Sequence, residues 1–445
     1  MALMVSVSGV RGLINDTLTP HVATEFAQAY GTLLKGGRVV LARDTRPSGE
    51  MFASAAAAGL LSAGCEVTNL GVCMTPTVGR AIVDGKFDGG VIITASHNPP
   101  AWNGIKFLDH QGLAPDPALA GQIATIRTEK RQSTVKSGFR AVKYDQAAGE
   151  RHVRAVVSAI EHDVSSLRGL PVVLDSVNGA GCRDGAALLI HFGCDLHHLN
   201  GAPTGEFAHE PEPIAENLTG LCDVVRAKKA AVGFAQDPDA DRLAIVDETG
   251  RYIGEEYTLA LATKFVMMKR PGPAAANLST SRLIDAVAAP HKVPVYRTAV
   301  GEANVARGMV AHRCVIGGEG NGGVIDPRIT LVRDSLSAMS LVLQLMAATG
   351  KPLSRLVDEL PRLAMIKQKF ECSRERIAEA VARVAKAFAG EKLNQTDGTR
   401  VDFAEGWVHL RASNTEPIVR IIAEAENEAS AKGLIERVRA AAGIG

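Results

Sequence analysis

The chain has 445 residues, of which 46% are hydrophobic and 4% aromatic, and its 49 basic and 48 acidic residues leave a formal charge of +1. At roughly 100–200 residues per domain, this length predicts two to four domains with ordinary globular cores. The even charge gives no support for a nucleic-acid or membrane-surface partner, and the scarcity of aromatic rings disfavours a base-stacking platform.

The cysteines and the first residues of the chain indicate the cellular compartment to expect. No cysteine forms a C-x-x-C pair and the number is odd, so neither a disulfide framework nor a structural zinc site is expected. Buried reduced thiols are the simpler interpretation of Cys65, Cys73, Cys182, Cys194, Cys222, Cys314 and Cys372. The first residues turn polar too soon for a signal peptide, and no apolar run approaches the roughly 18 residues of a membrane span. We therefore expect a soluble cytoplasmic protein.

The first region reads as a strand–helix–strand unit. An apolar run at Val39-Val-Leu precedes a polar loop, an Ala-rich helix from Met51 and a junction at Ala63-Gly-Cys-Glu-Val. Two segments place arginine beside glycine turns, Ser8-Gly-Val-Arg-Gly and Arg43-Asp-Thr-Arg-Pro-Ser-Gly. Either could line a pocket, although salt bridges between loops explain Arg43 and Arg46 equally well.

A polar loop, Thr94-Ala-Ser-His-Asn-Pro-Pro, follows the apolar run that begins at Gly89. A serine at the end of a strand is placed to attack a substrate, and His97 could accept a proton or orient a phosphate. Pro99 disfavours helix at Asn98 and so predicts a turn. Taken alone, a plain turn with a surface serine explains the segment better. No Gly-x-Ser-x-Gly elbow surrounds Ser96, so acyl transfer is not favoured.

Two further copies of the unit follow along the chain. The second runs from Val172-Val-Leu through Ser176-Val-Asn-Gly-Ala-Gly to Phe192-Gly-Cys-Asp-Leu, and a fainter third runs from Ala274 to Val293-Pro-Val-Tyr. Each copy leads to another apolar strand and a loop of glycine and polar residues. Ligands bind at the carboxyl ends of strands in open α/β sheets, so the three loops could face one cleft. The alternative is chance similarity between strand–helix–strand units.

The loop after the second copy is Asp237-Pro-Asp-Ala-Asp-Arg. Alternating aspartates on an extended loop can share one hard divalent cation, and without a cation they would repel one another. An EF-hand is excluded because no Gly-x5-Glu continuation follows. Arg242 could bind a phosphate through two parallel hydrogen bonds or pair with the aspartates themselves. A solvated acidic turn is the alternative to a metal site.

The loop after the third copy is Gly317-Gly-Glu-Gly-Asn-Gly-Gly. Its glycines let the backbone approach a ligand, and Glu319 and Asn321 could hydrogen-bond vicinal hydroxyls. It is not a P-loop, since no Gly-Lys-Ser/Thr follows. A flexible linker is the alternative, which the apolar strand leading into the loop makes weaker.

The C-terminal part, from about Gln368, has a different pattern. A helix over Arg374–Ala389, strands around Trp407 and Ile418, and a last helix from about Ala429 predict a small α+β domain. Arg411-Ala-Ser-Asn-Thr-Glu-Pro-Ile-Val-Arg gathers donors around a turn. Its candidate phosphate-binding residues are Arg411, Ser413, Asn414, Thr415 and Arg420. An ordinary turn with surface arginines is equally compatible with this segment.

Together these motifs resemble the α-D-phosphohexomutase family over the whole chain. Thr-Ala-Ser-His-Asn-Pro is similar to the family's phosphoserine loop and Asp-x-Asp-x-Asp-Arg to its metal loop. Gly-Glu-Gly-Asn-Gly-Gly is similar to its sugar-binding loop and Arg-x-Ser-Asn-Thr-Glu-Pro to its phosphate-binding loop. The four motifs occur in the family's order, one per domain.

The resemblance implies an α/β fold of three similar domains and a C-terminal α+β domain around a central active-site cleft. The expected boundaries are 1–150 for the phosphoserine domain, 151–252 for the metal domain, 253–366 for the sugar domain and 367–445 for the phosphate domain. It also implies one Mg²⁺ held by Asp237, Asp239, Asp241 and phosphoserine Ser96. A hexose 1,6-bisphosphate would be both intermediate and activator. Arg11, His97 and Arg242 are the expected catalytic residues beside Ser96, and Gly318 and Thr298 join the sugar-binding set.

Departures from the family pattern leave the sugar and the proton carrier open. The loop lacks the Ser-Gly-His ending of many relatives and resembles the archaeal-type phosphoglucosamine mutase branch. Ala299 stands where many relatives have a lysine, so Arg11 and His97 are the candidate acid or base. Phosphomannomutase/phosphoglucomutase is the alternative within the family, and a phosphoserine-forming phosphatase or a non-catalytic sugar-phosphate sensor lies outside it. The expected partner is a small phosphosugar, and the protein is expected to be a monomer or a homodimer.

Overall fold

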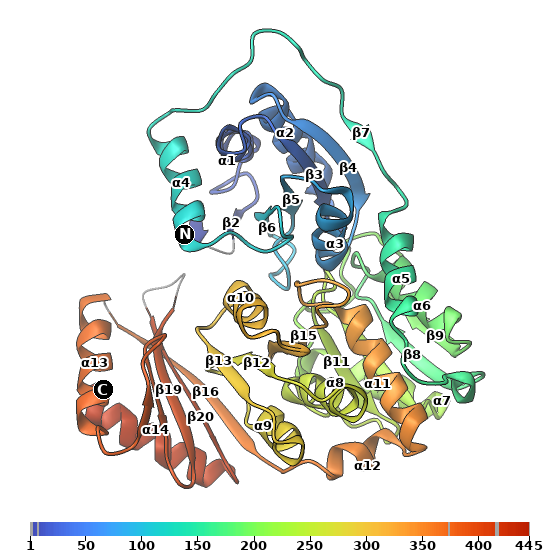
Figure 1. Ribbon diagram of the computed structural model, residues 1–445, viewed down its shortest axis with the longest axis vertical. Coiled ribbons are helices and arrows are strands. Elements are labelled where there is room, and N and C mark those ends of the chain that lie inside the picture. Colours follow the sequence, from blue (N-terminus) through green and yellow to red (C-terminus); the bar gives the residue numbers. More distant parts are fainter. Residues whose placement is uncertain (1–2, 7–8, 373, 414–417, 445) are drawn as a thin grey trace.

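Four β-sheets follow one another along the chain in the computed structural model, which describes residues 3–6, 9–372, 374–413 and 418–444 (Figure 1). The first sheet has the order β1-β2-β6-β5-β3-β4-β7. Its strands are β1 (Met4–Ser6), β2 (Gly9–Leu13), β3 (Arg38–Arg43), β4 (Glu66–Val72), β5 (Gly89–Ile93), β6 (Trp102–Asp109) and β7 (Lys143–Tyr144). Strand β3 runs parallel to β4 and β5, and β6 returns antiparallel to β5.

The second and third sheets repeat the centre of the first. The second has the order β11-β10-β8-β9, built from β8 (Pro171–Asp175), β9 (Asp195–Leu199), β10 (Val232–Gln236) and β11 (Leu243–Asp247). The third has the order β13-β12-β14-β15, built from β12 (Ala274–Asn277), β13 (Val295–Thr298), β14 (Ile316–Glu319) and β15 (Gly323–Ile325). Each has three parallel strands and one antiparallel return strand. The threefold repeat, including its faint third copy, is therefore confirmed.

The helices cover these sheets on both faces. Val39 and Leu41 of β3 pack into one apolar cluster, and Val40 and Ala42 into another, because successive side chains of a strand point to opposite faces. The helices of this region are α1 (Pro20–Leu33), α2 (Gly49–Ser62), α3 (Thr75–Gly85) and α4 (Pro117–Thr128). Thr19 and Asp116 cap α1 and α4, each with a proline in the first turn, which is a standard helix start.

The second and third sheets share one core. A single apolar cluster contains Leu174 and Phe234 of the second sheet and Ile316 of the third, joined through α8 (Glu255–Lys269) and α11 (Ser335–Thr349). The other helices around these sheets are α5 (Ala148–Ser158), η1 (Ser165–Leu167), α6 (Cys182–His191), η2 (Ala215–Asn217), α7 (Thr219–Lys228), α9 (Leu283–Ala288), η3 (Ala289–His291), α10 (Glu302–His312) and α12 (Leu353–Asp358). The two regions are therefore packed as one body.

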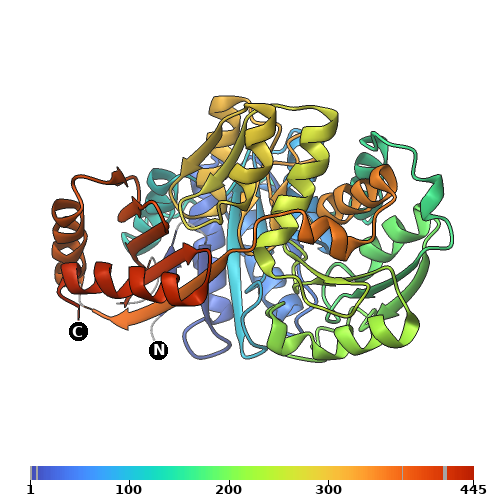
Figure 2. The same ribbon diagram turned by 90° about the horizontal axis from the view of Figure 1, so that it is seen from below.

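The C-terminal sheet has its own core and lies at one end of the molecule (Figure 2). Its order is β16-β20-β19-β18-β17, with β16 (Ala364–Glu371), β17 (Lys392–Asn394), β18 (Thr399–Asp402), β19 (Gly406–Ala412) and β20 (Ile418–Ala425). Helices α13 (Arg374–Ala387) and α14 (Glu428–Ala442) accompany it. Strand β16 pairs with β20 from Ala364 onward, so this sheet begins before the change of pattern seen near Gln368.

Two expectations about the whole chain can be compared with the structure. All seven cysteines are free thiols, and five are buried, whereas Cys194 and Cys222 are half-buried and pack at the margins of two apolar clusters. Within the described residues, no helix is both long and apolar enough to cross a membrane.

Candidate active site

Ser96 stands in a strained turn directly after β5. Its backbone is in the left-handed region, with φ of +52°, and its side chain is 1% exposed. A non-glycine residue adopts this conformation at a cost of about 1–3 kcal/mol, so the surroundings must hold it there. The amide of Ser96 donates to Thr94 Oγ1 at 2.9 Å, which closes the turn.

Arg46 holds the same turn from the loop after β3. Its guanidinium donates to the carbonyls of Ser96 (2.7 Å), Asn98 (2.6 Å), Pro99 (2.9 Å) and Trp102 (3.1 Å), and its Nε donates to Asp44 at 3.1 Å. Arg46 is 1% exposed. The sequence placed Arg46 near the nucleophile or in a salt bridge between loops. It lies beside the nucleophile and fixes the serine turn through the backbone, but its salt bridge is to Asp44 of its own loop and does not join two loops.

We expect Arg46→Met to lower the free energy of unfolding by about 3–5 kcal/mol, because Asp44 would remain as an unpaired buried charge. Urea unfolding measures this loss. Arg43→Met is the matched control, since Arg43 pairs with an exposed Glu50 and such surface pairs contribute about 0–1 kcal/mol. Equal losses in the two variants would contradict the role given to Arg46.

The Ser96 hydroxyl meets the aspartate loop. Its Oγ donates to Asp237 Oδ2 at 3.2 Å and lies 3.3 Å from His97 Nδ1. The loops after β5 and β10, which are equivalent in the repeat, are therefore in contact across 141 residues of sequence. The structure brings together the predicted nucleophile and the predicted metal loop.

His97 is surrounded by cationic groups. Repulsion from Arg242 is the main reason that the pKa of His97 falls to about 2, and burial and Arg11 add to it. His97 is thus neutral at physiological pH, and its Nδ1 lies beside Ser96 Oγ. Arg11, on β2, donates to Asn98 Oδ1 at 2.8 Å and so belongs to the wall of the same loop.

The three aspartates form one buried cluster. Asp237, Asp239 and Asp241 are each 0% exposed, and each offers a carboxylate oxygen within 4.8 Å of the others. Burial and repulsion from Asp241 and Asp239 raise the pKa of Asp237 well above its ordinary value. Ala240 lies in the left-handed region, with φ of +55°, which bends the loop between Asp239 and Asp241.

Lys106 and Thr75 hold Asp239. Lys106, on β6, places Nζ 2.5 Å from Asp239 Oδ2 and 3.6 Å from Asp241 Oδ2. The Thr75 hydroxyl donates to Asp239 Oδ2 at 2.7 Å. Burial alone would raise the pKa of Asp239, but the charge of Lys106 and these hydrogen bonds outweigh it and lower that pKa.

Arg333 connects the aspartate loop to the third loop. Its Nη2 donates to Asp241 at 2.6 Å and its Nη1 donates to Glu319 at 2.6 Å. Glu319 also accepts from Asn277 Nδ2 at 2.7 Å and from the amide of Gly301 at 3.2 Å. The three equivalent loops, those of Ser96, Asp237 and Glu319, thereby form one continuous polar network.

The cluster fits a hard divalent cation. Asp239 Oδ1 and Asp241 Oδ1 are buried and have no hydrogen-bond partner among the described residues. Buried carboxylate oxygens without donors are costly unless a cation binds them. The other four oxygens have donors: Lys106 and Thr75 for Asp239 Oδ2, Arg333 for Asp241 Oδ2, and the Ser96 hydroxyl and Arg242 amide for Asp237. The two oxygens without donors are therefore the ones available to a metal.

Glycine is required in the third loop by a close approach between two strands, whereas the sequence suggested an approach of the backbone to a ligand. A Cβ on Gly318 would lie 2.1 Å from the carbonyl oxygen of Gly323 on the paired strand β15. Asn321 Oδ1 is buried without a hydrogen-bond partner in the described part of the chain. Thr298, at the end of β13, donates to the carbonyl of Ala299 at 3.0 Å.

The candidate phosphate-binding segment lies in the C-terminal sheet. Arg411 on β19 and Arg420 on β20 are direct cross-strand partners, and Arg411 Nε donates to Asp397 at 3.2 Å. The amide of Ser413 donates to the carbonyl of Ile418 at 2.9 Å. Asn414 and Thr415 lie outside the described residues.

Reasoning from the sequence missed Lys106, Arg333 and Thr75. Lys106 is the one cation in the otherwise apolar run Ile105-Lys-Phe-Leu, and Arg333 stands directly before the long apolar helix α11. A lone charge beside an apolar element is a signal that such a residue has a buried partner. The sequence carries no indication of which partner that is.

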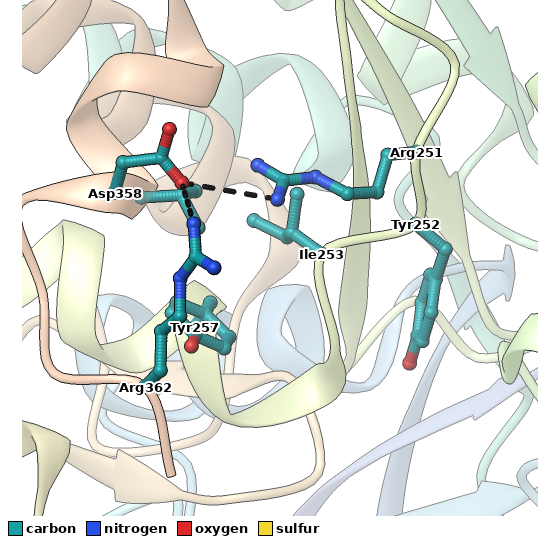
Figure 3. Close-up of a pocket in the computed structure, with 7 residues that line it drawn as sticks. Arg251, Tyr252, Ile253, Tyr257, Asp358 and Arg362 are labelled. Carbon is teal, nitrogen blue, oxygen red and sulfur yellow. Dashed lines mark hydrogen bonds and ion pairs between the residues drawn. The ribbon is translucent and has the colours of Figure 1, made fainter.

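A separate pocket lies away from these loops, between the turn before α8 and the end of α12 (Figure 3). Asp358 pairs there with Arg251 (3.9 Å) and Arg362 (3.4 Å). Tyr252, Ile253, Tyr257 and Val357 complete its lining. It contains no residue of the Ser96, aspartate or glycine loops, and its ion pairs are partly exposed, so we do not assign the chemistry to it.

Comparison with known proteins agrees with this geometry. Models of phosphoglucomutase/phosphomannomutase α/β/α domains I, II and III match residues 3–134, 150–250 and 254–363, and the model of the C-terminal domain matches residues 365–441. A phosphoglucomutase/phosphomannomutase of Thermococcus kodakarensis is 39% identical, covering 98% of this chain and 97% of that protein. A probable phosphoglucosamine mutase of Methanopyrus kandleri is 36% identical over 96% and 95% of the two chains. The crystal structure of a phosphoglucomutase/phosphomannomutase family protein from Burkholderia thailandensis superposes with a TM-score of 0.88 at 26% identity, covering 99% and 98% of the chains.

Proposed function

We infer the reaction of this chain from the premise that it belongs to the phosphoglucomutase/phosphomannomutase family. It is therefore an enzyme of the isomerase class, a phosphohexomutase. We propose that it interconverts hexose 6-phosphate and hexose 1-phosphate through a phosphoserine at Ser96, with glucosamine phosphate as the preferred sugar. The observation that carries this proposal is the contact of a strained, buried serine with a buried aspartate triad.

In the proposed cycle, a hydroxyl oxygen of the hexose phosphate attacks the phosphorus of phospho-Ser96, the bond from phosphorus to Oγ breaks, and the proton of that hydroxyl passes to Oγ. The resulting 1,6-bisphosphate reorients, Oγ attacks its other phosphorus, and the proton of Oγ returns to the sugar oxygen that leaves, which releases the isomeric monophosphate. The same bisphosphate would activate an unmodified enzyme by phosphorylating Ser96. Positioning and charge neutralisation are the main requirements of phosphoryl transfer, and the loops supply both.

Each residue around Ser96 has its own proposed role in this cycle. His97 Nδ1 lies 3.3 Å from Oγ, and we propose that it moves a proton to or from Oγ when the phosphoryl group is transferred. Arg242 Nε lies 3.8 Å from Asp241 Oδ1 as an ion pair but makes no hydrogen bond among the described residues, so we propose that it donates to a phosphate oxygen. Arg11 lines the same loop, and we propose that it neutralises charge on the transferring group.

Asp237, Asp239, Asp241 and the phosphoserine are the ligands we propose for one Mg²⁺. When bound, the ion supplies neutralisation of phosphate charge during transfer. Lys106 holds Asp239 through Oδ2, and Arg333 holds Asp241 through Oδ2. Both contacts leave Asp239 Oδ1 and Asp241 Oδ1 available to the ion.

Sugar and phosphate recognition are assigned to the remaining loops. Gly318, Glu319, Asn321 and Thr298 would contact the sugar ring, and Arg411, Ser413, Asn414, Thr415 and Arg420 would hold the phosphate that is not reacting. Domains with boundaries 1–150, 151–252, 253–366 and 367–445 are proposed around this site, with a small phosphosugar as the partner. The open buried oxygen of Asn321 supports a polar ring contact.

The preferred sugar rests on the Gly-Glu-Gly-Asn-Gly-Gly loop and on relatives named probable phosphoglucosamine mutase. Phosphomannomutase/phosphoglucomutase is the second candidate, because the Thermococcus kodakarensis relative at 39% identity has that name.

A side-by-side turnover assay on the phosphates of glucosamine, mannose, glucose and N-acetylglucosamine tests the assignment. We expect kcat/KM to be highest for glucosamine phosphate, by about 10-fold or more, which is what a few polar contacts can discriminate. Faster turnover of mannose or glucose phosphate would overturn the sugar assignment. Absence of turnover on all four, with the bisphosphate present, would overturn the mutase reaction itself.

A further inference from the structure

A fully buried histidine outside the catalytic loops joins three helices that belong to different parts of the chain. His152 lies on α5 and is 0% exposed. Its Nδ1 lies 2.8 Å from Thr77 Oγ1, on α3, and its Nε2 lies 3.1 Å from Asp334 Oδ2, at the start of α11. Thr77 and Asp334 are buried as well. The two hydrogen bonds that join His152 to Thr77 and Asp334, which we call the histidine tie, are therefore shielded from solvent.

The roles of the two ring nitrogens follow from Asp334. That carboxylate caps α11 by accepting from the amides of Leu336 (3.0 Å) and Ser337 (3.1 Å), and it can only accept. His152 Nε2 therefore carries a hydrogen and donates to Asp334. In the neutral ring, Nδ1 accepts from the Thr77 hydroxyl, so both nitrogens are satisfied and the ring orientation is fixed.

Both ends of the histidine tie adjoin residues that hold the aspartate loop. On the α3 side, Thr75 donates from its amide to the carbonyl of Asp239 (3.0 Å) and from its hydroxyl to the carboxylate (2.7 Å). On the α11 side, Arg333 donates to Asp241 at 2.6 Å and Ser335 Oγ donates to the carbonyl of Ala240 at 2.8 Å. Thr75 is two residues from Thr77, and Arg333 and Ser335 flank Asp334.

We propose that His152 is a positioning residue for the metal loop, which it serves by tying together the two segments that hold Asp239 and Asp241. This inference rests on the proposed metal site. The triad packs like charges together, so its carboxylates tend to separate unless the segments around them are fixed. Groups that orient metal ligands change metal affinity without touching the metal, and His152 acts one step further out, through Thr77 and Asp334.

If His152 served only to fill space in the core, its replacement would have a different effect on metal binding. Val156 lies one turn further along α5 and is 2% exposed in the apolar core, with no part in the hydrogen-bonded tie. Truncating Val156 loosens the same helix, whereas replacing His152 by leucine removes the tie and keeps an apolar side chain of moderate size. If His152 were a packing residue, the two changes would affect metal binding alike.

The test measures binding of Mn²⁺, by electron paramagnetic resonance, and of Mg²⁺, by calorimetry, to the full chain without substrate. We expect His152→Leu to raise the dissociation constant about tenfold, the low end for groups that orient ligands, and Thr77→Val to raise it less. Val156→Ala is expected to lower thermal stability and leave the dissociation constant unchanged.

Unchanged metal affinity in both His152→Leu and Thr77→Val would overturn the inference, as would an equal loss in Val156→Ala. Where His152→Leu does not fold, Thr77→Val decides, because it removes one hydrogen bond and preserves the side-chain shape. A wild-type chain that binds neither ion would overturn the proposed metal site, and the positioning role with it. The two failures are thus distinguishable.

Discussion

Replacing Ser96 by alanine is expected to lower turnover by about 10⁶-fold, the loss typical of removing a nucleophile. Oγ is the atom to which the phosphoryl group would be bound, and no other hydroxyl among the described residues contacts both His97 and Asp237 as Oγ of Ser96 does. The fold should survive, since the turn is held through the backbone by Arg46 and Thr94. Steady-state turnover on glucosamine phosphate measures the effect.

Intact-mass measurement separates this loss from a general defect. After incubation with a hexose 1,6-bisphosphate, the wild-type chain should gain the mass of one phosphoryl group, and Ser96→Ala should gain none. Ser158→Ala, a change at an exposed serine on α5, is the matched control and should retain both turnover and the adduct. An adduct of equal yield in Ser96→Ala would exclude Ser96 as the phosphorylated residue.

Asp239→Asn is expected to reduce Mg²⁺-dependent turnover by about a hundred- to a thousandfold, the usual cost of losing one strong electrostatic contact in an active site. Asparagine keeps the shape and can still accept from Thr75, but the triad loses one negative charge and Lys106 loses the nearer of its two ionic partners. Turnover measured against Mg²⁺ concentration should show weaker dependence on the ion as well as a lower maximum.

Asp223→Asn removes a carboxylate of the same kind from the exposed surface of α7, where it pairs with Arg226, and should leave the Mg²⁺ dependence unchanged. Wild-type activity in Asp239→Asn, with unaltered Mg²⁺ dependence, would rule out the aspartate triad as the metal site.

Much of the fold was predictable because it is encoded in neighbouring residues. The runs Val39-Val-Leu and Val172-Val-Leu, the helices after them and the Gly-Cys junctions reveal the repeated unit, and the same strand order in three sheets confirms it. The repeat also explains why Ser96, Asp237 and Glu319 occupy equivalent places, at the carboxyl ends of β5, β10 and β14. A repeat shows which loops are equivalent, so their meeting could be expected before any distance was known.

The sequence by itself therefore determined the fold class and the family, and it singled out the loops to which we assign the chemistry. The tertiary structure alone decided which charges face them. Lys106 reaches Asp239 across 133 residues, Arg333 reaches Asp241 across 92, and His152 reaches Asp334 across 182. Local patterns depend on the spacing of adjacent side chains, whereas these pairs depend on how separate sheets pack. For the same reason, only packing revealed that the second and third sheets share one core.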